Sequence, residues 1–424
     1  MRTFFKKIVL RILVTLAKIR LKRLRPFVIG ITGSVGKTST KDAIFTLLKT
    51  RYNVIRNEKS FNSEFGLPLA ILEQPSGFSS GWDWAAIVIK GTWKAFIGGK
   101  HLQMMVLEMG TDKPGDMTQL LQIVRPQIGV MTNIKPVHLG EGQFKDLEDI
   151  FMEKKKLVES LAERGIAILN GDDGYIAELG NSLNCKKMLY GSGEGCDVRL
   201  LAAESTLDGI ACTIQYKDEV LSEKFKLLGA YQAYVLLPAI AVGLSQGFSL
   251  KECMKALQNF TPPPGRMSMI AGLKGSSILD STYNASPETV KEALNLLREV
   301  APGRKIAVLG NMNELGERSE AFHREVGKYV PKRADVLVTV GDMAKFIAEE
   351  AQKEGLAAED IYHYGTADDA AKFLSSFLAQ SDTILVKGSQ NRIRLERLVK
   401  ALMADPLAAE TVLVRQEKQW KDIQ

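Results

Sequence analysis

A glycine-rich segment near the start of the chain, residues 30–39, constrains the fold more than any other stretch. It reads Gly-Ile-Thr-Gly-Ser-Val-Gly-Lys-Thr-Ser, follows an apolar run at 27–29 and leads into a segment with helical spacing. A strand, a glycine loop and a helix N-terminus in this order bind phosphate, because the loop N–H groups and the helix dipole both favour an anion. We therefore expect an α/β protein whose central P-loop ATPase domain has a mostly parallel sheet.

Two side chains at the end of this loop have roles that the pattern predicts. Lys37 would reach the outer phosphates, and the Thr38 hydroxyl would bind a magnesium ion that bridges them. The common spacing G-x-x-x-x-G-K would need glycine where Ile31 stands, and glycines recur here every third residue instead. A chance glycine-rich turn is the alternative, and the strand before it, the Lys-Thr pair and the helix after it argue against that.

The basic character of the chain belongs to its first 25 residues. The formal net charge is +7, and this segment carries nine Lys or Arg and no acid, so subtracting it leaves −2. A near-neutral body argues against a nucleic-acid partner. At helical spacing, apolar and basic residues of 1–25 fall on opposite faces, which predicts an amphipathic helix. Its apolar face would either dock on the body or a partner, or lie peripherally on the inner membrane surface. The apolar positions are Phe5, Ile8, Val9, Ile12, Leu13, Leu16 and Ile19, and the basic ones are Lys7, Arg11, Lys18, Lys22 and Arg25.

The four cysteines lack the spacing of a metal site or a disulfide framework. No C-x-x-C pair occurs, and histidine pairs are not nearby. Free thiols in a reducing compartment are the simplest interpretation, which places the protein in the cytoplasm.

Two further candidates follow apolar, strand-like runs. Glu108 ends the run at 104–109, where a nucleotide enzyme places a magnesium ligand; a solvated strand-end glutamate is the alternative. His138 follows the strand expected at 128–131, and either a site role or a structural role suits it. The helix after it carries four charged residues at 153–156, which by charge alone would form a solvated face.

The remaining chain suggests a second domain after a proline-rich linker at 261–266. Three successive prolines cannot continue a helix or sit in a central strand. Strands and helices then alternate, as in a doubly wound, Rossmann-like sheet. We expect an amphipathic helix at 1–25, an ATP-binding domain at 26–261 and a C-terminal domain at 262–424. Weaker signals indicate a loop with a short helix at 76–99, short strands and turns from about 172 to 226, and an apolar helix at 227–244.

Several motifs agree in order and spacing with one family. The chain resembles the Mur ligases, ATP-dependent amide-forming ligases of peptidoglycan synthesis. The motifs that carry the resemblance span residues 28 to about 400. They are the loop at 30–39, Asn62 to Leu69, Leu107 to Gly110, Thr132 to Ile134 with His138, Asn170 to Asp173, Gly265-Arg266, Asp280 with Tyr283 to Pro287, Gly310 to Gly316, and Lys387 to Ser389.

The resemblance implies a reaction in which ATP phosphorylates a carboxylate and an amine then attacks the acyl phosphate. It implies that the nucleotide is held by the loop residues Gly33, Ser34, Gly36, Lys37, Thr38 and Ser39, with Asn170, Arg266, Asp280 and Asn284. It also implies two magnesium ions, with Thr38 and Glu108 on one and His138 near the second. Lys154 aligns with a lysine that many members carry as a carbamate, although Lys155 and Lys156 are adjacent. The implied catalytic residues are Lys37, His138 and Lys154.

Departures from the family pattern leave the substrates open. Only the basic helix precedes the loop, where the family usually has a domain that grips the UDP-sugar. Tyrosine, glutamine and valine stand at 231–235 in place of the usual histidine and asparagines, and Gln390 follows Lys387 to Ser389 where arginine is frequent. Three hypotheses follow: addition of a dipeptide such as D-alanyl-D-alanine to a muramoyl-peptide precursor, a same-fold ligase for another carboxylate such as a polyglutamate, and a non-catalytic nucleotide-binding protein.

Overall fold

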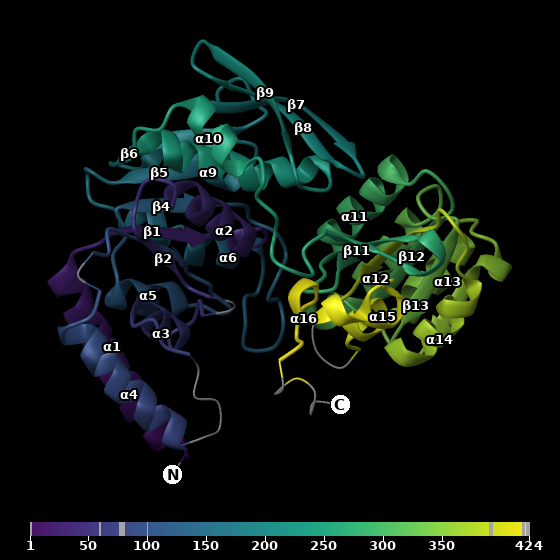
Figure 1. Cartoon of the computed structure of the whole chain (residues 1–424), viewed down its shortest axis with the longest axis horizontal. Coiled ribbons are helices and arrows are strands. Elements are labelled where there is room, and N and C mark those ends of the chain that lie inside the picture. Colours follow the sequence, from purple (N-terminus) through teal and green to yellow (C-terminus); the bar gives the residue numbers. More distant parts are fainter. Residues whose placement is uncertain are drawn as a thin grey trace.

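The computed structural model describes residues 2–58, 61–75, 81–99, 101–389, 393–417 and 420, leaving aside the side chains of 2–5, 81 and 82. Within these residues the chain forms two α/β bodies, each built on its own sheet (Figure 1). Both sheets are mixed and mostly parallel, which confirms the expected fold class. Gln390 and Arg392 lie outside the described residues.

The first sheet has nine strands in the order β2-β3-β1-β4-β5-β6-β7-β8-β9. The P-loop strand β1 pairs in parallel with β3 on one side and with β4 on the other. The carboxyl ends of these three strands therefore meet at one edge. The strands are β1 Phe27–Thr32, β2 Val54–Arg56, β3 Met104–Glu108, β4 Ile128–Met131, β5 Ile166–Asn170, β6 Lys186–Gly191, β7 Val198–Thr206, β8 Gly209–Tyr216 and β9 Glu219–Phe225.

Alternating side chains of these strands fill a core on each face of the sheet. In β1, Ile29 and Ile31 pack with α2 and α9 on one face, whereas Val28 packs with α3 and α5 on the other. Successive strand residues point to opposite faces, so a run of apolar residues marks a strand covered on both sides. The helices on the first face are α2 Lys37–Leu48, α9 Ala233–Ser245 and α10 Leu250–Leu257, and those on the second are α3 Gly66–Ile71, α5 Asp116–Ile123, α6 Leu147–Lys154, α7 Lys156–Glu159 and α8 Gly174–Leu179.

The strands β7, β8 and β9 extend this sheet as an antiparallel meander. The sequence predicted only short strands here, and β7 spans nine residues. Many of its side chains are exposed, so it lacks the continuous apolar run that identifies β1. The helix expected at 227–244 begins later, at Ala233 in α9.

The second sheet has six strands in the order β10-β11-β15-β12-β13-β14, and helices cover both faces. All its pairings are parallel except that of β10 with β11. The prolines 262–264 fall between α10 and β10. The elements are β10 Ser268–Ala271, β11 Ser277–Ser281, α11 Pro287–Val300, β12 Lys305–Gly310, α12 Ser319–Tyr329, β13 Val336–Val340, α13 Lys345–Lys353, β14 Ile361–Tyr364, α14 Ala367–Phe377, β15 Thr383–Lys387, α15 Leu395–Leu402 and α16 Ala409–Val412.

Two helices, α1 Arg2–Leu24 and α4 Gly81–Phe96, lie side by side and extend away from both sheets (Figure 1). Val9, Leu13 and Leu16 of α1 are buried in the core cluster that also holds Ile87 of α4. These three residues therefore support the alternative in which the apolar face of α1 docks on the body. The side chain of Phe5 is not among those that the structure describes. The prediction of a loop with a short helix at 76–99 is wrong, because α4 has 16 residues.

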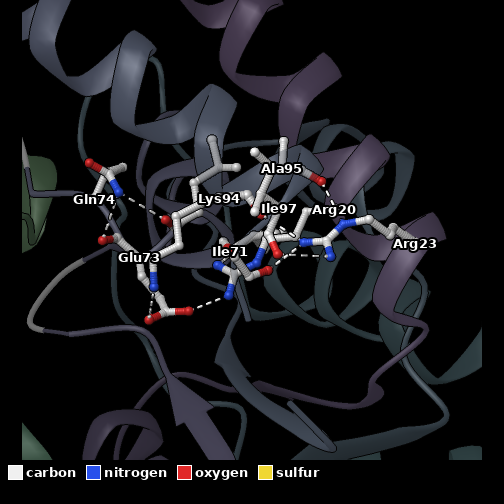
Figure 2. Close-up of polar contacts among 10 residues, drawn as sticks. Arg20, Arg23, Ile71, Glu73, Gln74, Lys94, Ala95 and Ile97 are labelled. Atoms are coloured by element: carbon white, nitrogen blue, oxygen red, sulfur yellow. Dashed lines mark hydrogen bonds and ion pairs between the residues drawn. The ribbon is translucent and has the colours of Figure 1, made fainter. Parts of the chain in front are cut away.

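Two arginines of α1 hold the helix pair in place: Arg20 fixes it to the body, and Arg23 joins α1 to the end of α4 (Figure 2). Arg20 is fully buried and donates to the backbone oxygen of Ile71 and to the carboxylate of Glu73, which also accepts from Lys94 at 2.8 Å. Arg23 donates to carbonyl oxygens at the end of α4, among them that of Ala95 at 2.8 Å. The last carbonyls of a helix have no partner within it, so a guanidinium there satisfies them and complements the helix dipole.

Candidate active site

The P-loop lies between β1 and α2 at the carboxyl edge of the first sheet. Gly36 forms the N-cap of α2 with a φ of 87°, and Gly33 has a φ of 140°. Both angles fall where glycine is favoured over other residues. A Cβ at Gly33 would lie 2.0 Å from Thr132 Oγ1, so glycine is required here by space as well as by backbone conformation.

The segment after β4 holds the loop in this shape. Asn133 accepts from Val35 N through its side chain at 2.8 Å and from Ser34 N through its backbone oxygen at 2.8 Å. The Ser34 hydroxyl donates to the backbone oxygen of Lys135 at 3.0 Å. Ser39 is buried on the first turn of α2. The Thr-Asn pair at 132–133 is therefore structural support for the loop, a contact that the sequence did not predict.

Lys37 and Thr38 lie at the open side of this loop. Lys37 Nζ donates to the backbone oxygens of Gly33 at 2.8 Å and Ser34 at 3.0 Å, and burial lowers its pKa. The Thr38 hydroxyl donates to Glu108 at 2.8 Å, and the other carboxylate oxygen of Glu108 accepts from Asn62 at 2.9 Å. The structure thus brings together the lysine, the hydroxyl and the strand-end carboxylate that the sequence singled out.

An arginine from the second body completes this cluster. Arg266 Nη2 donates to Thr38 Oγ1 at 2.9 Å, across a separation of 228 residues in the sequence. Its guanidinium lies 4.0 Å from the centre of the Tyr283 ring, which fixes its plane. A cation from one body therefore faces the phosphate loop of the other.

Lys154 and Glu153 are both buried, so the prediction of a solvated face at 153–156 is wrong for these two residues. Lys154 Nζ donates to Thr111 Oγ1 at 2.8 Å, and Lys154 is fully buried. Burial, together with the nearby charge of Lys37, lowers its pKa to about 7. Lys155 and Lys156 instead pair with glutamates and stay partly exposed, so Lys154 is the lysine of the three that lies in the site.

His138 lies where the two bodies meet. Its Nδ1 is 2.7 Å from the carboxylate of Glu314 in the second body, and its Nε2 is 3.6 Å from that of Asp112. The contact with His138 lowers the pKa of Glu314. Both His138 and Glu314 have a positive φ, 56° and 60°. Non-glycine residues with this strained backbone are uncommon and cluster at functional sites.

Asn170, Asp280 and Asn284 surround the cluster in different ways. Asn170, at the end of β5, is buried and donates to the backbone oxygen of Thr132 at 2.7 Å. Asp280, in β11, is fully buried, and burial raises its pKa to about 6; within the described part of the chain its Oδ2 has no hydrogen-bond partner. The Asn284 side chain is exposed, and its backbone oxygen accepts from Lys387 at 2.9 Å. Their predicted contacts with a nucleotide remain predictions.

Four polar side chains next to the site were not predicted as site residues: Asn62, Thr111, Asp112 and Glu314. Asn62 and Glu314 lie inside motifs that carried the family resemblance, so the sequence held a signal for them. Thr111 and Asp112 come three and four residues after Glu108, the last residue of β3, and their position just beyond a strand end was the available clue. Contacts across the two bodies, such as that of Glu314, need the tertiary structure.

The oxygen ligands at the loop fit a magnesium ion held together with phosphates. Among the residues described, no group of three His, Cys, Asp or Glu could hold a metal ion by itself. Mg²⁺ is usually bound through one or two carboxylates plus the phosphates of a substrate, and Thr38 and Glu108 already lie in contact. The predicted metal role of His138 remains a prediction.

Comparisons with known proteins agree with this geometry. The model of the Mur ligase middle domain matches residues 31–243, and that of the Mur ligase glutamate ligase domain matches 265–390. The UDP-N-acetylmuramoyl-tripeptide--D-alanyl-D-alanine ligase of Bacillus subtilis is 32% identical over 398 residues, which are 93% of this chain and 79% of that protein.

Two solved structures are similar along most of the chain. MurF from Acinetobacter baumannii has a TM-score of 0.78 and 25% identity, over 93% of this chain and 80% of that one. The MurF ligase from Thermotoga maritima in complex with ADP has a TM-score of 0.77 and 26% identity, over 92% and 83%. Both likenesses extend over the two bodies that meet at the loop.

Proposed function

The chain belongs to the Mur ligase family. We propose that it is the ATP-dependent ligase that adds D-alanyl-D-alanine to a UDP-muramoyl-tripeptide. The observation that carries the proposal is the meeting of Lys37, Thr38 and Glu108 with Arg266 of the other body. Relatives named UDP-N-acetylmuramoyl-tripeptide--D-alanyl-D-alanine ligase match the chain across both bodies.

ATP would bind with its phosphates on the loop, because the N–H groups there and the N-terminus of α2 point toward an anion. Lys37 would leave the carbonyl oxygens of Gly33 and Ser34 and contact the outer phosphates. Arg266 would neutralise the charge that develops as the phosphoryl group moves to the substrate carboxylate. The amine of the dipeptide would then attack the acyl phosphate, giving the amide, ADP and phosphate.

Thr38 and Glu108 would hold a magnesium ion, which when bound neutralises phosphate charge. Glu108 is oriented for this by Asn62, and its backbone N–H donates to Asn57 Oδ1 at 2.8 Å. Lys154, with its pKa of about 7, is partly a neutral amine near neutral pH. A neutral amine is the form that reacts with CO₂, so the predicted carbamate at Lys154 suits this environment.

Closure of the two bodies over the loop would exclude water from the acyl phosphate. The contacts of Arg266 with Thr38 and of His138 with Glu314 are the links that support this role. Both join the loop edge of the first sheet to the second body.

The test is a substrate panel with the purified protein, ATP and magnesium. Phosphate should be released, and the amide product detected by mass spectrometry, only when UDP-muramoyl-tripeptide and D-alanyl-D-alanine are both present. A panel in which glutamyl substrates give product and this pair gives none would overturn the substrate assignment while keeping the ligase chemistry. Phosphate release with no amide product from any pair would overturn the ligase assignment itself.

A further inference from the structure

One helix of the N-terminal pair leaves an apolar face uncovered. Ile89, Trp93 and Phe96 of α4 are 71%, 54% and 55% exposed, and Ile97, directly after the helix, is 58% exposed. The spacing of four and three residues places the first three on one side of the helix. The opposite side, with Ile87 and Ala95, is buried in the core cluster that it shares with α1. An exposed patch of large apolar side chains marks an interaction surface more often than a free one.

The neighbouring helix α1 carries a cluster of exposed positive charges. Lys6, Lys7, Arg11, Lys18 and Lys22 of α1 are exposed, and no acidic residue occurs before Asp42. Ile8 and Ile12 of α1 are also more than a third exposed, one helical turn apart. Two acids lie in or next to the pair: Asp83 in the first turn of α4, and Glu73, which is bound by Arg20 and Lys94.

We propose that the α1–α4 pair is a docking surface for an anionic lipid bilayer. The apolar side of α4 would enter the headgroup region, with Trp93 at the interface that tryptophan favours. The lysines and arginine of α1 would bind the lipid phosphates. Charge complementarity favours this occupant, because exposed apolar side chains on α4 together with five exposed cations on α1 match a surface that is apolar below and anionic above.

The pair would lie on the membrane and not cross it. Among the residues that the structure describes, no helix is long and apolar enough to span a bilayer. The pair also extends away from both sheets, so a surface could reach it without covering the P-loop (Figure 1). This inference does not depend on the proposed ligase reaction, and its test measures no catalysis.

Sedimentation of the full chain with vesicles tests the proposal. Binding is expected to mixed phosphatidylglycerol and phosphatidylcholine vesicles at low salt, and it should weaken with added salt and on phosphatidylcholine alone. The triple variant Lys7→Gln, Arg11→Gln, Lys18→Gln should bind roughly a hundredfold more weakly, at about fivefold per charge. The matched control Lys224→Gln, Lys251→Gln, Lys372→Gln removes three exposed charges elsewhere and should bind like the wild type.

Separate variants test the contribution of the apolar side chains to vesicle binding. Ile89→Ser with Trp93→Ser should weaken binding at least about tenfold, whereas Leu407→Ser, at a side chain that is 92% exposed on the second body, should not. The difference between the tryptophan emission spectra of the wild type and of Trp93→Phe reports on Trp93. On vesicle binding this difference spectrum should shift to the blue and be quenched by brominated lipids. Circular dichroism confirms that each variant is folded.

Two results would overturn the proposal. One is equal binding of the wild type and the triple charge variant to anionic vesicles. The other is absence of vesicle binding together with self-association or protein binding that Trp93→Ser abolishes, which would assign the face to a protein contact.

Discussion

Lys37 illustrates how a single side chain is held ready at the loop. Its ammonium group is bound by two carbonyl oxygens of the same loop, and its pKa is lowered by burial. A phosphate would offer it stronger, fully charged acceptors. The residue is therefore placed to exchange weak internal partners for a ligand.

Replacing Lys37 by alanine should lower the ligase rate by at least about a hundredfold, because a cation aimed at the transferred phosphoryl group is lost. The rate is measured as phosphate release under saturating substrates. Lys49→Ala, which removes an exposed lysine just after the same helix, serves as the control and should retain activity. Full turnover by the Lys37 variant would contradict the assignment of the loop.

The buried Lys387 should make the stability of the protein depend on pH. It is buried and donates to Ser281 and to the backbone oxygen of Asn284, and its pKa falls to about 7, chiefly through burial. Because this value lies below the ordinary 10.5, the unfolded chain binds more protons between pH 7 and pH 10.5. The free energy of unfolding therefore rises with pH in that window, and the cost of the buried charge is present in full below it.

Lys387→Met should remove this cost. The stability difference between variant and wild type should shrink by about 1 kcal/mol for each pH unit above 7. Urea unfolding followed by circular dichroism at several pH values measures it. Lys400→Met, at an exposed position of α15, should show no such trend, and a difference for Lys387→Met that does not change with pH would refute the prediction.

At the scale of elements, sequence patterns predicted the strands that helices cover on both faces of the sheet. β1 and β4 were predicted from apolar runs, and the loop from its glycines, because both signals are local. α4 was predicted only as a short helix within a loop, whereas it has 16 residues. Gly91 within it, and apolar residues on its exposed as well as its buried side, obscured its length. The candidate site residues Lys37, Thr38, Glu108 and Lys154 were predicted from motifs, whereas the contact of Arg266 with Thr38 depends on how the two bodies pack.

The buried Arg20 shows what holds α1 in place. Arg20→Met should destabilise the helix pair by about 3 kcal/mol, because it leaves the Ile71 carbonyl unpaired and Glu73 with Lys94 alone. Hydrogen exchange of α1 and α4 measures this directly. Arg11→Met, at an exposed position of the same helix, should change exchange little. Equal exchange in Arg20→Met and wild type would show that apolar packing alone secures the pair.

At the scale of the whole molecule, the contacts between the two bodies decide how open the site is. The segment after β4 reaches the second body twice: Leu139 N donates to Glu314 O at 3.1 Å, and the His138 ring faces the Glu314 carboxylate. The P-loop is braced by the same segment. Movement of the second body would therefore shift the segment that holds the P-loop in its conformation.

Glu314→Gln should loosen this junction, because it keeps the shape of the side chain and removes its charge. The expected loss is about 1 kcal/mol, in the range of a partly exposed ion pair. Hydrogen exchange of residues 133–146 should become about fivefold faster, and the KM for substrates should rise. Glu317→Gln, exposed in the same loop region, is the control; unchanged exchange in Glu314→Gln would mean that the backbone contact alone holds the bodies together.

The pairing of α1 with α4 has a consequence for synthesis on the ribosome. The last residue of α4 is made 72 residues after Leu24, the last of α1, so at 5–20 residues per second α1 waits about 4 to 14 s for its partner. During that time its cations and apolar residues are both uncovered. We therefore expect α1 to be available to an anionic surface near the ribosome before the nucleotide-binding fold has formed.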